Sequence, residues 1–241
     1  MRQAGRVAAF ALAALAIGAG PRSGYETMTP ELRAMQDDDL ANPGMLSVAE
    51  GEALFAAQGC TGCHAVEAMR GVAARYPALD AASGAPIDLT GRIAQCREAR
   101  QHRPPLPREG REMLALTAFV AHQSRGMPLQ PDPRLEEARR EGEALFRERR
   151  GQLNLSCAQC HDDHAGRHLA GSVIPEGHPN GYPMYRLEWQ ALGSLQRRLR
   201  NCIAGVRSEP FPTGAPEYVA LEAYLVARAR GLLVETPAVR P

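Results

Sequence analysis

The sequence predicts a mainly α-helical protein built from two tandem copies of one unit, and three features support this fold class. The segment EGEALF occurs twice, at 50–55 and 141–146. A Cys-x-x-Cys-His motif follows each copy, and a helical segment ending in Arg-Gly closes each half. A chain of 241 residues can hold two small domains, each with its own apolar core. Repetition on this scale indicates that one folding unit occurs twice.

The first 25 residues have the character of a signal peptide. Arg2 and Arg6 precede an apolar stretch over 7–17, which is shorter than the ~20 apolar residues of a membrane-spanning helix. Small residues follow, and we place cleavage between residues 18 and 26. No later stretch is apolar enough to cross a bilayer. We therefore expect an exported, periplasmic protein with no membrane span.

The first unit begins with a helix that EGEALF is expected to open. Ser47 and Glu50 fit a capping box at the start of this helix, with Leu46 placed for a hydrophobic staple. A closing helix over 116–126 ends in Arg-Gly, with the glycine placed as a C-cap. Three prolines within 127–137 then interrupt the helical pattern and mark the join between the units.

The second unit repeats this order of elements. Residues 182–205 are expected to form one helix that Gly205 ends, and a closing helix is expected over 221–231. Arg198 and Cys202 stand one helical turn apart, so they share a face of the helix. The expected domains are 26–132 for the first unit and 133–241 for the second.

The two Cys-x-x-Cys-His motifs predict covalently attached haem. In this motif the two thiols add across the haem vinyl groups, and the adjacent histidine becomes the proximal iron ligand. Two such motifs after a signal peptide favour haem attachment over a zinc site or a redox dithiol. The sequence therefore indicates two cytochrome c-like domains, each with one haem c. The attachment residues are Cys60, Cys63 and His64 in CTGCH, and Cys157, Cys160 and His161 in CAQCH.

The sixth iron ligand of each haem is predicted to be a cysteine. Only Cys96 and Cys202 fall at matching places in the repeat, each four residues after an arginine, Arg92 or Arg198. A thiolate is a strong donor to haem iron and lowers its potential relative to methionine. A Cys96–Cys202 disulfide and two inert core cysteines are the alternatives. Other candidate ligands are Met69, Met113, Met127, His164, His168, His178 and Met184.

Arginine is the residue that would bind an anion in this protein. All 28 basic side chains are arginine, and the net charge of +1 argues against nucleic acid as a partner. Arg198 would favour the thiolate form of Cys202 and could offer its fork of donors to an oxyanion. Pairing of Arg198 with a haem propionate is an equal alternative.

The segments GYPMYRLEWQALGSLQRRLRNCIAGVR and PEYVALEAYLVARARGLLVETPAVRP resemble the SoxA family, the dihaem subunits of the SoxAX cytochromes of bacterial sulfur oxidation. The likeness covers essentially the whole chain after the signal peptide and is strongest from Cys157 onward. It implies an L-cysteine S-thiosulfotransferase that couples thiosulfate oxidatively to a cysteine of the carrier SoxYZ. It also implies transfer of two electrons to a cytochrome and a heterodimer with the small cytochrome SoxX.

The resemblance also implies roles for individual residues. Cys202 matches the family's haem-ligating, persulfide-bearing cysteine, and Arg198 matches its substrate-contacting arginine. His161 matches the proximal ligand of that haem, and His64 with Cys96 would be the axial pair of the first haem. Two other functions stay open: a thiosulfate dehydrogenase that forms tetrathionate, and a plain dihaem electron-transfer cytochrome c.

Overall fold

The computed structural model describes residues 20–241, so most of the predicted signal peptide lies outside the described residues. In that range the protein is mainly α-helical, as predicted, and no helix is both long and apolar enough to span a bilayer. The α-helices are α1 Pro30–Asp37, α2 Met45–Ala57, α3 Leu89–Gln101, α4 Arg111–His122, α5 Glu136–Arg147, α6 Cys157–His161, α7 Leu195–Gly205 and α8 Pro216–Arg228. The strands are β1 Ala78–Leu79, β2 Pro86–Ile87, β3 His168–Leu169, β4 Ser172–Val173, β5 Met184–Arg186, β6 Ala191–Gly193 and β7 Ala238–Arg240.

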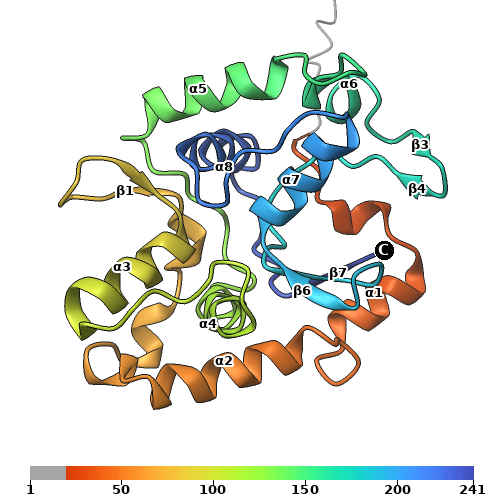
Figure 1. The fold of residues 1–241 in the computed structure, drawn as a ribbon. Coiled ribbons are helices and arrows are strands. Elements are labelled where there is room, and N and C mark those ends of the chain that lie inside the picture. The colour runs from red at the N-terminus through yellow and green to blue at the C-terminus, as the bar shows by residue number, and fades with distance from the viewer. Residues whose placement is uncertain (1–19) are drawn as a thin grey trace, which may run out of the picture.

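Two helices, α4 and α8, lie at the centre of the molecule, and each packs against an earlier helix of its own half (Figure 1). α2 lies along α4, and α5 lies along α8. A Cβ atom on Gly51 of α2 would lie 2.0 Å from the carbonyl oxygen of Ala115. A Cβ atom on Gly142 of α5 would lie 2.0 Å from that of Ala220. Only glycine therefore fits at either crossing.

An aromatic pair completes each crossing. The rings of Phe55 and Phe119 lie 5.3 Å apart between centroids, and those of Phe146 and Tyr224 lie 5.3 Å apart as well. EGEALF supplies both the crossing glycine and the first aromatic ring, which gives a physical reason for its presence in both halves. The segment lies inside α2 and at the end of α5, so the prediction that it opens these helices is wrong.

The capping box predicted at Ser47 is also wrong, because α2 begins at Met45 and Ser47 already lies inside the helix. The side chain of Asn42 accepts a hydrogen bond from the N–H of Gly44, 2.9 Å away. A Cβ atom on Gly44 would lie 2.7 Å from the Cβ atom of Pro237. Leu46 is 78% exposed, so it forms no staple. Asn42 also donates to the carbonyl of Pro237, 2.9 Å away, so this helix start is supported by contact with the C-terminal segment.

Each half also contains a hairpin followed by a helix, in the same register. Ala78 pairs with Ile87 between β1 and β2, and Met184 pairs with Gly193 between β5 and β6. α3 follows the first hairpin and α7 follows the second. Residues 106 positions apart along the chain therefore occupy equivalent places in the two hairpin–helix segments.

The helix predicted over 182–205 is wrong in its first half. Residues 184–186 form β5, which pairs with β6 and, in parallel, with β7 near the C-terminus. The side chain of Ser194 accepts a hydrogen bond from the N–H of Arg197, 3.1 Å away, and so starts α7. The helix ends at Gly205 as predicted. Long-range strand pairing overrides the local helical pattern here.

The segments that follow the two central helices pair with each other. The N–H of Gly126 donates to the carbonyl of Val234, 2.9 Å away. The N–H of Gly231 donates to the carbonyl of Leu129, 3.1 Å away, which is the equivalent bond. Both glycines have a positive φ, 78° and 86°, but α4 and α8 end before them, so the predicted C-caps are wrong in position. The join at 127–137 is non-helical up to its last two residues, which begin α5.

The chain before α2 packs against the second half. α1 lies beside β7, where the side-chain oxygen of Gln36 accepts a hydrogen bond from the N–H of Val239, 3.0 Å away. Arg22 forms an ion pair with Glu176 at 2.8 Å. The N-terminal and C-terminal segments therefore hold the two halves together, in addition to the central pairing. The domain limits 26–132 and 133–241 stay a prediction.

Candidate functional site

The second Cys-x-x-Cys-His motif forms the short helix α6, whose start is fixed by a capping box. Ser156 Oγ accepts from the N–H of Gln159 at 3.3 Å, and Gln159 Oε1 accepts from the N–H of Ser156 at 2.9 Å. This turn places Cys157 and His161 on the wall of a cavity of about 390 Å³. Nδ1 of His161 donates to the carbonyl of Pro175, 2.7 Å away. Nε2 is therefore the ring nitrogen available to a metal.

α7 brings Arg198 and Cys202 to the same cavity. Burial, with a contribution from the charge of nearby Cys202, raises the pKa of Cys157 to about 11. Burial also lowers the pKa of His161, which favours the neutral imidazole that binds metals. Cys160 is half-buried on the same turn of α6. Four of the predicted site residues thus converge on one cavity.

The chemistry of this cavity fits a covalently held haem. Cys157 and Cys160 on one turn can form the two thioether links, while His161 and Cys202 offer one nitrogen and one sulfur to the iron. Nδ1 of His178, in the cavity lining, is buried without a hydrogen-bond partner, and a haem carboxylate would satisfy it. Among residues 20–241, no three His, Cys, Asp or Glu side chains converge as a metal site, so a zinc centre gains no support.

The other candidate iron ligands fall into distinct places. Met113 is fully buried in the helical core, and His164 is exposed, with its ring nitrogen 2.7 Å from the carbonyl of Gln159. All six cysteines are free, so Cys96 and Cys202 form no disulfide. Met69 packs against the apolar core of the first half, and Met127 packs against Gly71. The candidates that share the cavity with Cys202 are His168, His178 and Met184.

The first motif repeats this arrangement with a more open histidine. Cys60 starts a short 3-10 turn, and Cys63 and His64 are exposed. Cys96 on α3 lies near Cys60, because burial raises the pKa of Cys60 and the charge of a Cys96 thiolate adds to this rise. An attachment cysteine thus lies close to the cysteine of the following helix in both halves.

In the first half the arginine that precedes this cysteine is neutralised. Arg92 forms an ion pair with Asp80 at 2.8 Å, and its Nε donates to the hydroxyl of Tyr76 at 3.3 Å. Hydrogen bonds from Ser83, Gln95 and Arg92 hold the pKa of Asp80 well below its usual range. Asp80 therefore stays ionised, and Arg92 is held by it rather than free to bind an anion.

In the second half the equivalent arginine has no such partner. Among the described residues, Arg198 makes no ion pair and no side-chain hydrogen bond. The place of Asp80 is taken by Arg186, which also lines the cavity. Arg186 is not among the predicted site residues, although the repeat contains the signal: Arg186 stands 106 residues after Asp80, as Arg198 does after Arg92.

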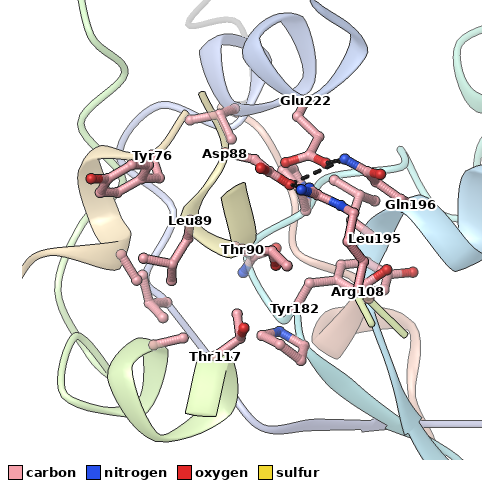
Figure 2. A pocket seen from close by; sticks show the side chains of 18 of the residues that line it. Tyr76, Asp88, Leu89, Thr90, Arg108, Thr117, Tyr182, Leu195, Gln196 and Glu222 are labelled. Atoms are coloured by element: carbon pink, nitrogen blue, oxygen red, sulfur yellow. Dashed lines mark hydrogen bonds and ion pairs between the residues drawn. The ribbon is translucent and has the colours of Figure 1, made fainter. Parts of the chain in front are cut away.

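A second, smaller cavity of about 100 Å³ lies between the halves (Figure 2). Glu222 of α8 and Asp88 at the start of α3 meet there across the amide of Gln196, which donates to Glu222 at 2.9 Å and to Asp88 at 3.1 Å. Arg108 pairs with Asp88. Burial raises the pKa of Glu222 to about 8, and the charge of Asp88 contributes. None of the residues predicted to carry function lies in this cavity.

Three comparisons relate the chain to known proteins. The family model described as "SoxA/TsdA, cytochrome c domain" matches residues 49–129 and 141–234. The L-cysteine S-thiosulfotransferase subunit SoxA of Pseudaminobacter salicylatoxidans is 36% identical over 90% of this chain and 80% of its own length. That of Paracoccus pantotrophus is 31% identical over 90% of this chain and 78% of its own. The crystal structure of SoxXA from P. pantotrophus matches with a TM-score of 0.88 and 30% identity, over 92% of this chain and 87% of that chain.

Proposed function

Because the chain belongs to the SoxA family, we propose that it is the SoxA subunit of a periplasmic L-cysteine S-thiosulfotransferase. The observation that carries the proposal is the convergence of His161, Arg198 and Cys202 on one cavity of the second half. The names of the relatives support the activity, and the likeness to a SoxXA crystal structure supports a SoxX partner.

A cytochrome c domain carries covalently bound haem c, and we propose two such groups here. The first haem would be attached at Cys60 and Cys63, and the second at Cys157 and Cys160. His64 with Cys96 would hold the iron of the first haem, and His161 with Cys202 would hold that of the second.

The proposed reaction joins the outer sulfur of thiosulfate to a cysteine thiol of the carrier SoxYZ. One sulfur–sulfur bond forms, one S–H bond breaks, and the reaction releases one proton and two electrons. When bound, haem would supply the acceptor for these electrons, and an electron-accepting cytochrome c would remove them.

Cys202 is proposed as the first acceptor of thiosulfate. Its sulfur, or a persulfide on it, forms the new sulfur–sulfur bond with loss of two electrons and one proton. The carrier thiol then attacks, takes over the thiosulfonate and returns Cys202 to its starting form without further oxidation. Arg198 lies one turn away on the same helix and holds the sulfonate end while charge shifts at the reacting sulfurs.

The test is to mix the oxidised holoprotein and SoxX with thiosulfate and SoxYZ, and to measure both the carrier mass and soluble tetrathionate. Sulfur transfer predicts a carrier that gains one thiosulfonate group, with no tetrathionate. Tetrathionate beside an unmodified carrier identifies a thiosulfate dehydrogenase. The absence of both products identifies an electron-transfer cytochrome. Full conjugation by Cys202→Ala would remove Cys202 from the chemistry and leave it only an iron ligand.

A further inference from the structure

The charge at one position of the repeated hairpin is inverted between the halves. Asp80 follows β1, and its N–H donates to the carbonyl of Ala85, 2.9 Å away. Arg186 ends β5 and pairs with Ala191. Both pairs stand 106 residues apart in sequence, so Arg186 occupies the backbone position of Asp80. An acidic group faces the helix arginine in the first half, and a second cation replaces it in the second half.

The shared register also places Arg186 at the hairpin position that corresponds to the ion-pair partner of the helix arginine. In the first half, the side chain at this hairpin position reaches the helix arginine directly, because Asp80 and Arg92 lie 2.8 Å apart. Arg186 and Arg198 extend from the equivalent backbone positions, and both line the cavity that contains Cys202. Two like charges in such a place repel each other unless an anion lies between them.

Arg186 has unused hydrogen-bonding capacity. Its side chain is 14% exposed, and its Nε is buried without a partner among residues 20–241. One terminal nitrogen pairs with Glu188 at 2.9 Å, but Glu188 is 63% exposed, so this pair is weak. Within the described part of the chain, no aspartate or glutamate side chain lines the cavity. Arg240, the remaining arginine of the lining, is already paired with Glu235.

We propose that Arg186 is a second oxyanion-binding residue of the Cys202 cavity and that it acts together with Arg198. The ligand class is a tetrahedral oxyanion, assigned here to the sulfonate end of thiosulfate, with three oxygens to share between two guanidinium forks. Held in this way, the sulfonate leaves the outer sulfur free to approach Cys202. The assignment to thiosulfate rests on the proposed function, whereas the oxyanion site itself does not.

A haem carboxylate is the other source of this anion chemistry, and two kinds of measurement separate them. Sulfate, which cannot react, is titrated into the oxidised holoprotein by calorimetry, and the KM for thiosulfate is measured in the conjugation assay. The potential and absorption spectrum of the second haem are recorded in parallel. The variants are Arg186→Gln and Arg186→Asp, of which the second restores the charge pattern of the first half. Arg197→Gln is the matched control, because Arg197 stacks on Trp189 with 4.2 Å to the ring centre and does not line the cavity.

The proposal predicts that Arg186→Gln weakens sulfate binding and raises the KM for thiosulfate by about tenfold. Arg186→Asp should have a larger effect, up to about 100-fold, because the new carboxylate pairs with Arg198. The haem spectrum and potential should stay unchanged, and Arg197→Gln should behave as wild type. Unchanged sulfate binding and unchanged KM in the Arg186 variants would overturn the proposal, whether or not the haem potential shifts. A wild-type protein that binds no sulfate would also overturn it. Sulfate binding that depends on Arg186, in protein that leaves the carrier unmodified, would support the oxyanion site and reject the proposed function.

Discussion

Arg92 in the first half pairs with Asp80, whereas Arg198 in the second half lines the same cavity as Arg186 and has no acidic partner among residues 20–241. The hairpin register and the helix that follows are the same in both halves. The difference shows that one scaffold can carry an arginine neutralised by a carboxylate in one half and, among the described residues, an arginine without an ion pair in the other. A single change of charge, from Asp80 to Arg186, accounts for much of the contrast.

The histidines of the two motifs also differ in their surroundings. His64 is exposed, while Nδ1 of His161 is bonded to the carbonyl of Pro175. The segment after the second motif is longer and contains the β3–β4 hairpin, and Pro175 follows that hairpin. The second half therefore orients its histidine with a backbone carbonyl that its own insertion provides.

The largest expected contrast concerns the two cysteines on the helices that follow the hairpins. Cys202→Met keeps a sulfur ligand for iron but has no thiol, so conjugation of thiosulfate to the carrier should fall by at least about a thousandfold. Cys96→Met, the matched change in the first half, should keep most of the activity. Steady-state assays with haem content checked by absorption measure both. Equal losses in the two variants would remove the distinction between the halves.

The helix crossings should respond alike, because they are built alike. Gly51→Ala and Gly142→Ala each place a Cβ atom 2.0 Å from a carbonyl oxygen. Each variant should lose about 3 kcal/mol or more of unfolding free energy, because the backbones must separate. Thermal and denaturant unfolding of the holoprotein provide the measurement. A large loss of unfolding free energy in Gly51→Ala with little loss in Gly142→Ala would contradict the equivalence of the crossings.

Substitution of Arg198 should affect substrate binding, whereas substitution of Arg92 should affect stability. Arg198→Gln should raise the KM for thiosulfate by about 10- to 100-fold with little change in unfolding free energy, because Arg198 has no partner among the described residues. Arg92→Gln should leave the KM unchanged and cost about 1–2 kcal/mol, because it leaves buried Asp80 with hydrogen bonds but without its charged partner. The reverse pattern, with Arg92 controlling KM, would place the substrate site in the first half.

A smaller effect is expected at the cavity between the halves. Burial raises the pKa of Glu222 to about 8, whereas in the unfolded chain this carboxyl group ionises near pH 4. The contribution of protonated Glu222 to stability is therefore full at low pH and is lost as the pH rises towards 8. Glu222→Gln should therefore stabilise the protein by about 1–3 kcal/mol at pH 8 and by less at pH 4. Thr117 is the uncharged residue of the first half that corresponds to Glu222, so Thr117→Ser should leave the pH profile of unfolding unchanged. An identical pH profile for wild type and Glu222→Gln would show that Glu222 is ionised in the folded state.

The helical fold, the repeat and four residues that line the cavity could be predicted from the sequence, because they depend on local motifs and matching intervals. Features that depend on contacts far apart in the chain could not be predicted in this way. The start of α2 depends on Pro237, and β5 forms because β7 pairs with it. Arg186 stood inside an expected helix, so its relation to Asp80 became visible only when the hairpin register was known.

Mass spectrometry of the peptides that contain Cys96 and Cys202 tests the central claim most directly. The oxidised holoprotein is treated with thiosulfate in the absence of carrier and then digested without reductant. The account predicts added sulfur or thiosulfonate mass on Cys202, removable by reductant, and an unmodified Cys96. An unmodified Cys202, or added mass on Cys96 alone, would contradict it.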